Sequence, residues 1–337
     1  MPDFDSGHIF LTTMAPIKGP EGNTTHTSFE QKVRMALVKL PTALQSPATQ
    51  NIGLNSPFAR NTRTHLARMF VLNDTVYNGR VGSNPLLNMG QNLTRLQHVD
   101  QLNCSYLVFC ADIDAVTEDG APLPKVMSAT KQKEVRAAYA RKLWDTMELE
   151  LQDIYSNCVG FEDVDTADEF AAYLEKCHVQ TTMPFHDYYL ELPKFNDLPI
   201  KLLVGAVAVP AVVALIALLL RILGYLDMPW LGWSTLWTFI GALIVTALAL
   251  VWAIWYANQN GEKPLPPAKY DDLPSVLKAL YMQQTFADFA IAQQGASAQD
   301  LHASFGAFLD AHKPSDKSGP TQKPGVISSV AIHQAID

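Results

Sequence analysis

Cysteine is scarce in this sequence, and the cysteines present follow no pairing pattern. The 337 residues contain four, Cys104, Cys110, Cys158 and Cys177, with no C-x-x-C pair. This excludes a disulfide-rich scaffold and a cysteine-based zinc motif, so we expect reduced thiols of the kind found in the cytoplasm. The first residues are acidic and lack the basic and apolar regions of a secretory signal peptide, so we expect none.

An excess of basic charge and the common catalytic motifs are also missing. Lys and Arg total 25 against 33 Asp and Glu, a formal net charge of −8. This balance argues against a nucleic-acid partner, which requires a basic surface. The sequence contains no G-x-S-x-G nucleophile elbow, no G-x-G-x-x-G turn and no phosphate-binding P-loop. No particular reaction is indicated, and whether the protein is an enzyme stays open.

Charge is absent from two long apolar runs. Residues 202–220 and 236–256 are runs of nineteen and twenty-one residues without a charged side chain. At about 1.5 Å per residue, each run makes a helix about as long as a bilayer core is thick. The connection between them is short, so the sequence predicts an antiparallel transmembrane hairpin. Pro210 is expected to bend the first helix.

Aromatic and basic residues around these runs predict how the hairpin sits in a membrane. Lysines gather beyond its outer ends, whereas its connection carries only Arg221. The positive-inside rule then predicts a bacterial cytoplasmic (inner) membrane protein with two spans and both termini cytoplasmic. Indole and phenol rings prefer the headgroup layer. The expected membrane-interface residues are Trp230, Trp233, Trp237, Trp252, Trp255 and Tyr256.

The first 195 residues alternate between strand and helix patterns. Ignoring one short helix, their order is βαββαβ, which predicts a ferredoxin-like α+β domain with helices on one sheet face and the other face open. The expected strands are 8–15, 64–72, 105–111 and one within 179–192, and the expected main helices begin near 29 and at 131. The division that we expect is an α+β domain over 1–195, the hairpin over 196–258, and a C-terminal helical pair with an extended tail over 259–337.

Five short motifs in residues 8–115 resemble those of a set of poorly characterised bacterial proteins with a ferredoxin-like, α+β-barrel-type domain. The motifs are Leu11-Thr12-x-x-Ala15-Pro16-Ile17-Lys18, Pro57-Phe58-Ala59-Arg60, His65-x-Ala67-Arg68, Val71-Leu72-x-Asp74 and Tyr106-Leu107-Val108-Phe109. The resemblance implies the fold and no catalytic residue. More remote α+β-barrel relatives include haem-dependent dye-decolorising peroxidases and chlorite dismutases, whose proximal histidine lies on a helix. The helix expected over 131–156 has no histidine. We therefore expect no cofactor, with haem as an alternative.

The densest cationic cluster is Arg60, Arg63, His65 and Arg68, and the candidate residues for binding an anion are Arg60, His65 and Arg68. Strand alternation places His65 opposite Arg68, and Arg68 on the same face as apolar residues, where its guanidinium needs an anion. Asp112 and Asp114, at the end of the third strand, are possible ion-pair partners. Two hypotheses stay open, a structural ion pair or a binding site for an anionic ligand.

Histidines and aspartates elsewhere do not have the spacing of metal ligands. The possible set is His8, His65, His178 and His186 with Asp112, Asp114 and Asp187, and none forms an H-x-x-x-H pair with a carboxylate. The spacing therefore predicts no metal site.

The C-terminal region predicts two helices, over 272–294 and from 297 onward. Apolar residues surround most of the first helix, which is typical of a helix buried on several sides. This pair is expected to cover the open sheet face or to dock on another subunit. The leading hypothesis is thus a membrane-anchored, cytoplasm-facing accessory or assembly protein that forms a homo-oligomer or joins other membrane-complex subunits. The alternative is a membrane-associated enzyme or binding module for an anionic or lipid-like substrate.

Overall fold

The structure, a computed structural model, describes residues 3–20, 26–41, 55–73, 102–181, 189–194, 197–229 and 231–324. Contacts divide the chain into two units. Unit 1 combines Met1–Leu190 with Pro266–Asp337, and unit 2 is Glu191–Leu265. The expected division had three parts, whereas here the C-terminal segment groups with the N-terminal domain.

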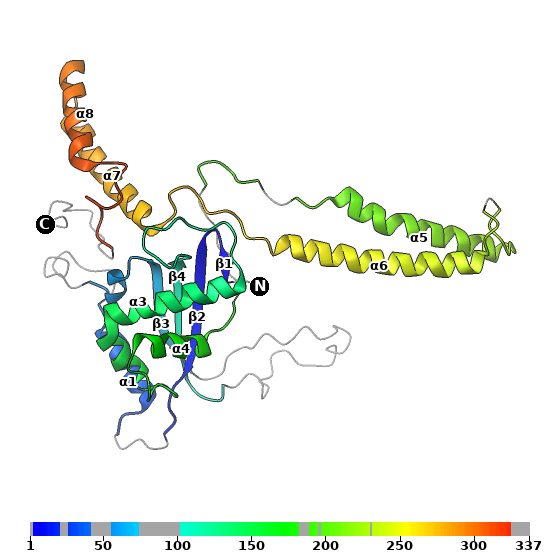
Figure 1. The fold of residues 1–337 in the computed structure, drawn as a ribbon, viewed down its shortest axis with the longest axis horizontal. Coiled ribbons are helices and arrows are strands. Elements are labelled where there is room, and N and C mark those ends of the chain that lie inside the picture. Colours follow the sequence, from blue (N-terminus) through cyan, green and yellow to red (C-terminus); the bar gives the residue numbers. More distant parts are fainter. Residues whose placement is uncertain are drawn as a thin grey trace. The chain divides into compact units, whose positions relative to one another are not determined.

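Unit 1 is built on a four-stranded antiparallel sheet (Figure 1). Its strands are β1 (Phe4–Asp5), β2 (His8–Pro16), β3 (Thr64–Leu72) and β4 (Tyr106–Asp114), in the order β1-β2-β4-β3. β4 pairs with β2 on one side and with β3 on the other. The mixed α+β class expected from the sequence is confirmed.

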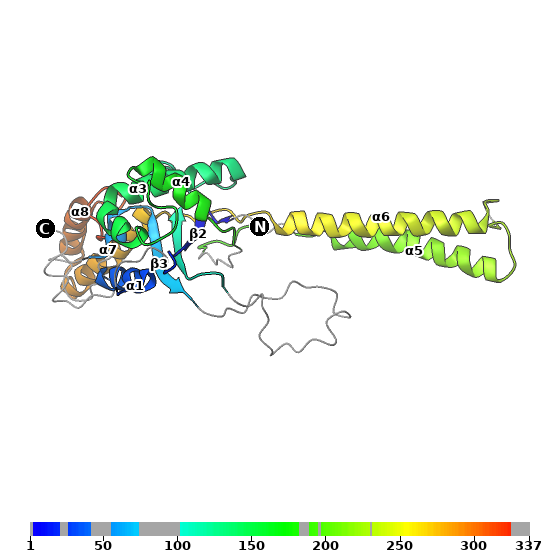
Figure 2. The same ribbon diagram turned by 90° about the horizontal axis from the view of Figure 1, so that it is seen from below.

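Two helices, α3 (Ala129–Tyr155) and α4 (Ala167–Cys177), lie against one face of this sheet (Figure 2). A third helix, α1 (Phe29–Lys39), packs beside β3 and against α3, and a short 3-10 helix η1 (Pro57–Arg60) lies between α1 and β3 in the sequence. Hydroxyl side chains start each α-helix, because Ser28, Ser128 and Thr166 accept hydrogen bonds from first-turn amides. The long α3 contains a kink at Met147, whose backbone is non-helical.

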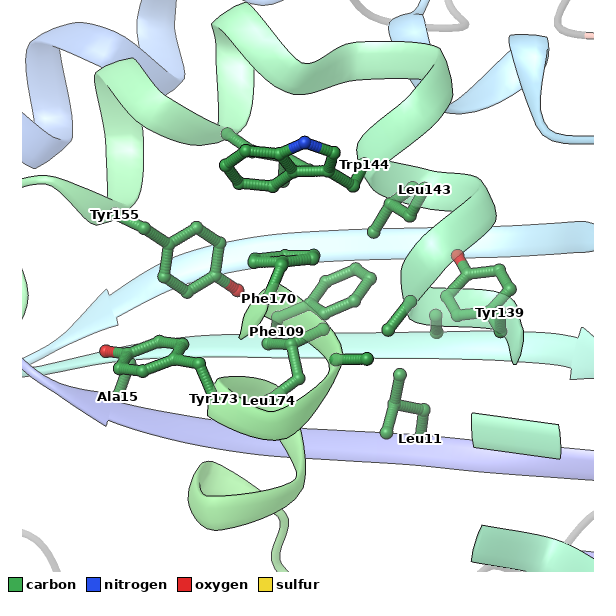
Figure 3. Close-up of a cluster of buried hydrophobic side chains, with 14 of the residues drawn as sticks. Leu11, Ala15, Phe109, Tyr139, Leu143, Trp144, Tyr155, Phe170, Tyr173 and Leu174 are labelled. Atoms are coloured by element: carbon green, nitrogen blue, oxygen red, sulfur yellow. The ribbon is translucent and has the colours of Figure 1, made fainter. Parts of the chain in front are cut away.

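Alternate residues of the strands build the core with these helices. Leu11, Ala15 and Phe109 point toward α3 and α4 (Figure 3). Tyr155 of α3 packs against Phe170 of α4 with ring centroids 5.6 Å apart. Burying a large apolar side chain contributes about 1.5–3 kcal/mol, so this aromatic layer is the main apolar support of the sheet.

The opposite face of the sheet carries exposed side chains on β3. Leu66 is 73% exposed and Phe70 36% exposed, and Arg68 between them is also exposed. From Leu66 onward, alternate side chains of β3 thus point to opposite faces of the sheet, as the sequence predicts, and Ala67, Met69 and Val71 pack against the core.

The sheet differs from the expected ferredoxin-like plan at its last strand. The position beside β2 is held by β1, and an isolated antiparallel bridge joins Thr13 to His178, the residue that precedes the strand expected over 179–192. Residues 182–188 of that strand lie outside the described residues. The order of strands therefore differs from the expectation, and the helices are more numerous.

Unit 2 is a hairpin of α5 (Ile200–Ile222) and α6 (Thr235–Gly261), which pack along each other (Figure 1). α5 continues through Pro210, where the sequence led us to expect a bend. The connecting turn is closed by a bridge between Asp227 and Ser234. The buried Thr235 hydroxyl donates to the carbonyls of Tyr225 and Leu226, which fixes the start of α6.

Both hairpin helices are long and apolar enough to cross a membrane. Side chains such as Leu215 and Leu248 point outward, with 56% and 65% of their surface exposed. The predicted interface tryptophans Trp233, Trp237, Trp252 and Trp255 are exposed, and Trp252 packs on Tyr256. Trp230 lies outside the described residues.

The C-terminal segment of unit 1 forms α7 (Leu273–Ala292) and α8 (Ala298–His312). Phenylalanines join them, with Phe289 and Phe308 rings 4.9 Å apart, and the Tyr281 hydroxyl lies 2.6 Å from His312 Nδ1. Several apolar side chains nevertheless stay exposed, whereas the sequence predicted a helix buried on several sides. They are Leu280, Phe286 and Ile291 on α7, and Leu301, Phe305 and Leu309 on α8.

Candidate functional site

Polar side chains converge at one end of the sheet, where β2 begins and β4 ends. His8 is the first residue of β2 and pairs in register with Asp114, the last residue of β4. Asp112 lies one pleat away on β4, so its carboxylate points to the same face. His8, Asp112 and Asp114 thus place three ionisable side chains on one face at this end of the sheet.

His65 joins this group because β3 is irregular. The register between β3 and β4 shifts between Thr64 and Leu66, which leaves His65 as the extra residue of a bulge. The Thr64 hydroxyl bonds to Tyr139 of α3, while the His65 imidazole reaches Asp114. The alternation expected for β3 therefore does not hold at His65, because a bulge re-aims the side chain.

Short distances hold the cluster together. His65 Nε2 lies 2.8 Å from Asp114 Oδ1. His8 Nδ1 lies 3.6 Å from Asp112 Oδ1 and 3.8 Å from Asp114 Oδ1. The two imidazole rings meet edge to face, with centroids 4.9 Å apart.

The chain segment that follows unit 2 closes the cluster. Asp271 Oδ2 lies 2.7 Å from His8 Nε2, and the backbone N–H of Leu273 donates to Asp114 Oδ2 at 3.1 Å. Gly7 permits this approach, because a Cβ at its position would lie 2.8 Å from Pro267 Cβ, and its φ is +83°. Residues far apart in the sequence thus supply one site.

Burial and charge act in opposite directions on His8. Burial disfavours its charged form, but the hydrogen bond to Asp271 and the nearby carboxylates outweigh burial and raise the pKa of His8 above its ordinary value. Burial raises the pKa of Asp112, while His8 and His65 oppose that rise. His8 and Asp114 side chains are only 2% and 4% exposed, so these charges interact in a weakly screened environment.

The donor atoms have the chemistry of a metal site. His8, His65 and Asp114 each offer one ligand atom, and these atoms lie within 4.8 Å of one another. Imidazole nitrogens and carboxylate oxygens are donors for Zn²⁺ and neighbouring divalent ions. The sequence spacing predicted no metal site; of the histidines and aspartates weighed there, His178 instead pairs with Asp3 at 2.7 Å, and His186 and Asp187 lie outside the described residues.

The predicted cationic cluster is spread over three places. Arg60 pairs with Glu150 of α3 at 2.9 Å, Arg68 lies 5.5 Å from the Phe70 ring centroid, and His65 bonds to Asp114. Asp114 is thus a partner of His65, and Asp112 faces His8, whereas the sequence led us to expect Arg68 beside them.

Sequence reasoning missed Asp271 and a second ion-pair group. Asp271 lies in the linker next to the N-cap of α7, and nothing in a single sequence indicates that this linker returns to β2.

The second ion-pair group is centred on Asp119, in the loop after β4. Its carboxylate accepts a hydrogen bond from Arg63 Nε at 2.7 Å and also bonds to Lys142. These two cations and the Thr62 hydroxyl outweigh burial and lower the pKa of Asp119 to about 2.

An apolar groove borders the cluster at His65. Its volume is about 480 Å³, and its walls come from α1, η1, β3 and the first turns of α7. Leu37, Phe58, Met69 and Leu277 are among the lining residues, whereas Arg60 and Arg68 are not. Of the cluster residues, His65 is the one that lines this groove.

Comparison with protein-family models, curated proteins and solved structures found no match to this chain. The functional conclusions therefore rest on the site and the fold alone.

Proposed function

We propose that this protein is a membrane-anchored accessory or assembly protein. The observation that carries the proposal is the hairpin of unit 2, whose helices expose aliphatic side chains along their length. The hydroxyls of Thr238 and Thr246 donate to carbonyls one turn earlier in their own helix. Because an ion or proton pathway requires intramembrane polar groups, this hairpin suits anchoring and helix packing better than transport.

The orientation that we propose is cytoplasmic for both ends of the hairpin, in a bacterial inner membrane. Antiparallel helices place residue 200 and residue 261 on the same side of a bilayer. Lys194, Lys201 and Lys263 flank those ends, whereas Arg221, in the last turn of α5, is the one basic residue at the opposite end of the hairpin. Unit 1 then faces the cytoplasm, in keeping with its free cysteines.

The assembly part of the proposal is supported by α7 and α8. Phe286 and Ile291 are 48% and 66% exposed on α7, and Leu301 and Phe305 are 42% and 40% exposed on α8. Exposed apolar side chains gathered on two helices favour contact with another protein, either a second copy of this chain or a membrane-complex subunit. The ferredoxin-like plan also belongs to this proposal, supported by the β2-β4-β3 order and the Thr13–His178 bridge.

Native mass measurement after gentle detergent extraction tests the proposal. We expect a particle of at least twice 37.2 kDa, or one containing other subunits. The double variant Ile291→Ser with Leu301→Ser should release a single chain, whereas Leu66→Ser on the exposed sheet face should not. A single 37.2 kDa particle from the unmodified protein would contradict assembly.

A binding module for a lipid-like ligand is the second candidate function. The groove favours it, because about 480 Å³ of mostly apolar space is enough for an acyl chain. A fluorescent fatty acid should bind the purified protein, and Leu277→Asp, which places a charge in the groove, should abolish binding. Equal binding by this variant and the unmodified protein would contradict the candidate.

A further inference from the structure

The donor atoms of the His8 cluster have the spacing of ligands around one ion. His65 Nε2 and Asp114 Oδ1 are 2.8 Å apart, and His8 Nδ1 is 3.6 Å from Asp112 Oδ1 and 3.8 Å from Asp114 Oδ1. Donors at 2.0–2.2 Å from a tetrahedral zinc ion lie about 3.4 Å from one another. The ligand atoms of His8, His65 and Asp114 lie within 4.8 Å of one another, so small side-chain rotations would bring these three to that spacing, and Asp112 Oδ1 already lies 3.6 Å from His8 Nδ1.

Asp112 supplies a second, independent observation. Its Oδ1 is buried and accepts no hydrogen bond from the described part of the chain, and 3.6 Å to His8 Nδ1 is too long for one. An unsatisfied buried carboxylate oxygen is costly, and the cost disappears when a cation binds it.

Hydrogen bonds from neighbouring groups hold the donor residues, as they hold the ligands of metal sites. Asp271 lies at hydrogen-bond distance from His8 Nε2, which would fix the tautomer that presents Nδ1 to an ion. The Leu273 N–H holds the other oxygen of Asp114. In metal sites, a ligating histidine typically donates its second N–H to a carboxylate, and a ligating carboxylate is itself hydrogen-bonded.

We propose that His8, His65, Asp112 and Asp114 bind one divalent transition-metal ion, and that the bound ion secures the segment Asp271–Leu273 against the sheet. Two imidazoles with two carboxylates suit Zn²⁺ and its neighbours in the first transition row, whereas Mg²⁺ and Ca²⁺ prefer oxygen-only sites. His65 lines the apolar groove and its side chain is partly exposed, so an ion can approach it from solvent. All residues of the proposed metal site belong to unit 1, so this proposal does not depend on whether unit 2 is anchored in a membrane.

The test is zinc binding by the full, untagged chain in detergent, after a chelator has removed bound metal. Zn²⁺ is titrated in competition with a chromophoric chelator. We expect one Zn²⁺ per chain, and at least about tenfold weaker binding in His65→Gln and in the near-isosteric Asp112→Asn. The matched control is His178→Gln, which removes an imidazole paired with Asp3 at 2.7 Å outside the cluster, close to the 2.8 Å of the His65–Asp114 pair. This control should bind Zn²⁺ as the unmodified protein does.

Hydrogen exchange at the Leu273 amide is the second readout, and its comparison of the unmodified protein with and without Zn²⁺ does not depend on the stability of a variant. Zn²⁺ should slow exchange at this amide in the unmodified protein and leave it unchanged in Asp112→Asn. Absence of zinc uptake by the unmodified chain, or equal affinity in Asp112→Asn, His65→Gln and the control, would overturn the proposal and leave the cluster as a buried network of hydrogen bonds. Because neither readout depends on membrane insertion, failure here and failure of the anchoring proposal are distinguishable.

Discussion

His8 Nε2 lies 2.7 Å from Asp271 Oδ2, although the two residues are 263 positions apart in the sequence. The contact joins the start of β2 to the segment that follows the apolar hairpin. The chain thus leaves unit 1 after Leu190, forms the hairpin, and returns at Pro266 to complete unit 1. The hairpin is an insertion into a domain, and the His8 cluster is where the returning chain attaches.

Removing the charge of Asp271 should loosen that attachment. Asp271→Asn leaves the shape of the side chain but weakens a hydrogen bond to a charged group, so we expect unit 1 to lose about 1–2 kcal/mol of stability. Calorimetric unfolding in detergent measures the loss. Asp288→Asn, at an exposed position on α7, is the matched control and should change stability by less than about 0.5 kcal/mol. Equal effects of the two substitutions would show that Asp271 does not attach the segment.

Asp119 should make unit 1 sensitive to acid. Its pKa is lowered from 3.8 to about 2 in the folded protein, so its carboxylate stabilises the fold above about pH 4, and this contribution is lost as the pH falls toward 2. The Asp119 side chain is 51% exposed, and solvent screening limits the contribution to about 1 kcal/mol.

The comparison of Asp119→Asn with the unmodified protein between pH 7 and pH 2 tests this contribution. The variant should be less stable at pH 7, and the two stability curves should converge near pH 2. Glu118→Gln, at the exposed neighbouring position, should follow the unmodified protein throughout. A constant difference across the whole range would mean that the Asp119 charge is not responsible.

The aromatic core should depend on Phe109 far more than the open sheet face depends on Phe70. Phe109 is fully buried and its ring stacks on Phe58 with centroids 5.8 Å apart, whereas Phe70 is 36% exposed. We expect Phe109→Ala to cost about 3–5 kcal/mol, and Phe70→Ala about 1 kcal/mol or less. Thermal unfolding of the two variants gives the comparison, and similar losses would mean that Phe70 is as deeply buried as Phe109.

A charge in the middle of α6 should impair membrane insertion. Leu248 is 65% exposed on that helix, and an arginine at the centre of a span costs about 2.5–3.5 kcal/mol on insertion. Leu248→Arg should therefore shift the protein from the membrane pellet to the alkaline-soluble fraction, whereas Leu248→Ile should stay in the pellet. Retention of the arginine variant would indicate that Leu248 does not face lipid.

Local pattern was enough to predict the parts of this fold that depend on neighbouring residues. The uncharged runs predicted α5 and α6, and alternating or continuous apolar residues predicted β2, β3 and β4. Helix starts are local in the same way, because a cap such as Thr166 and its first turn lie within four residues.

Contacts between distant segments could not be predicted in the same way. The β3 bulge that re-aims His65 depends on pairing with β4, and the approach of Asp271 to His8 depends on where the hairpin returns. The predicted cluster of Arg60, His65 and Arg68 assumed regular alternation and ignored Glu150, which lies on a helix 90 positions away from Arg60. The members of the His8 cluster show no recognisable spacing in the sequence, because they come from three strands and a linker.

The most direct test of the central claim is lysine labelling with a membrane-impermeant amine reagent. Every lysine of the chain lies outside residues 202–262, so the hairpin and its connection contain none beyond Lys201 and Lys263 at their ends. In intact bacterial spheroplasts that express the protein, we predict no labelling, and after permeabilisation we predict labelling on both sides of the hairpin. Labelling of lysines in intact spheroplasts, on one flank or on both, would contradict a cytoplasm-facing protein anchored by a two-span hairpin.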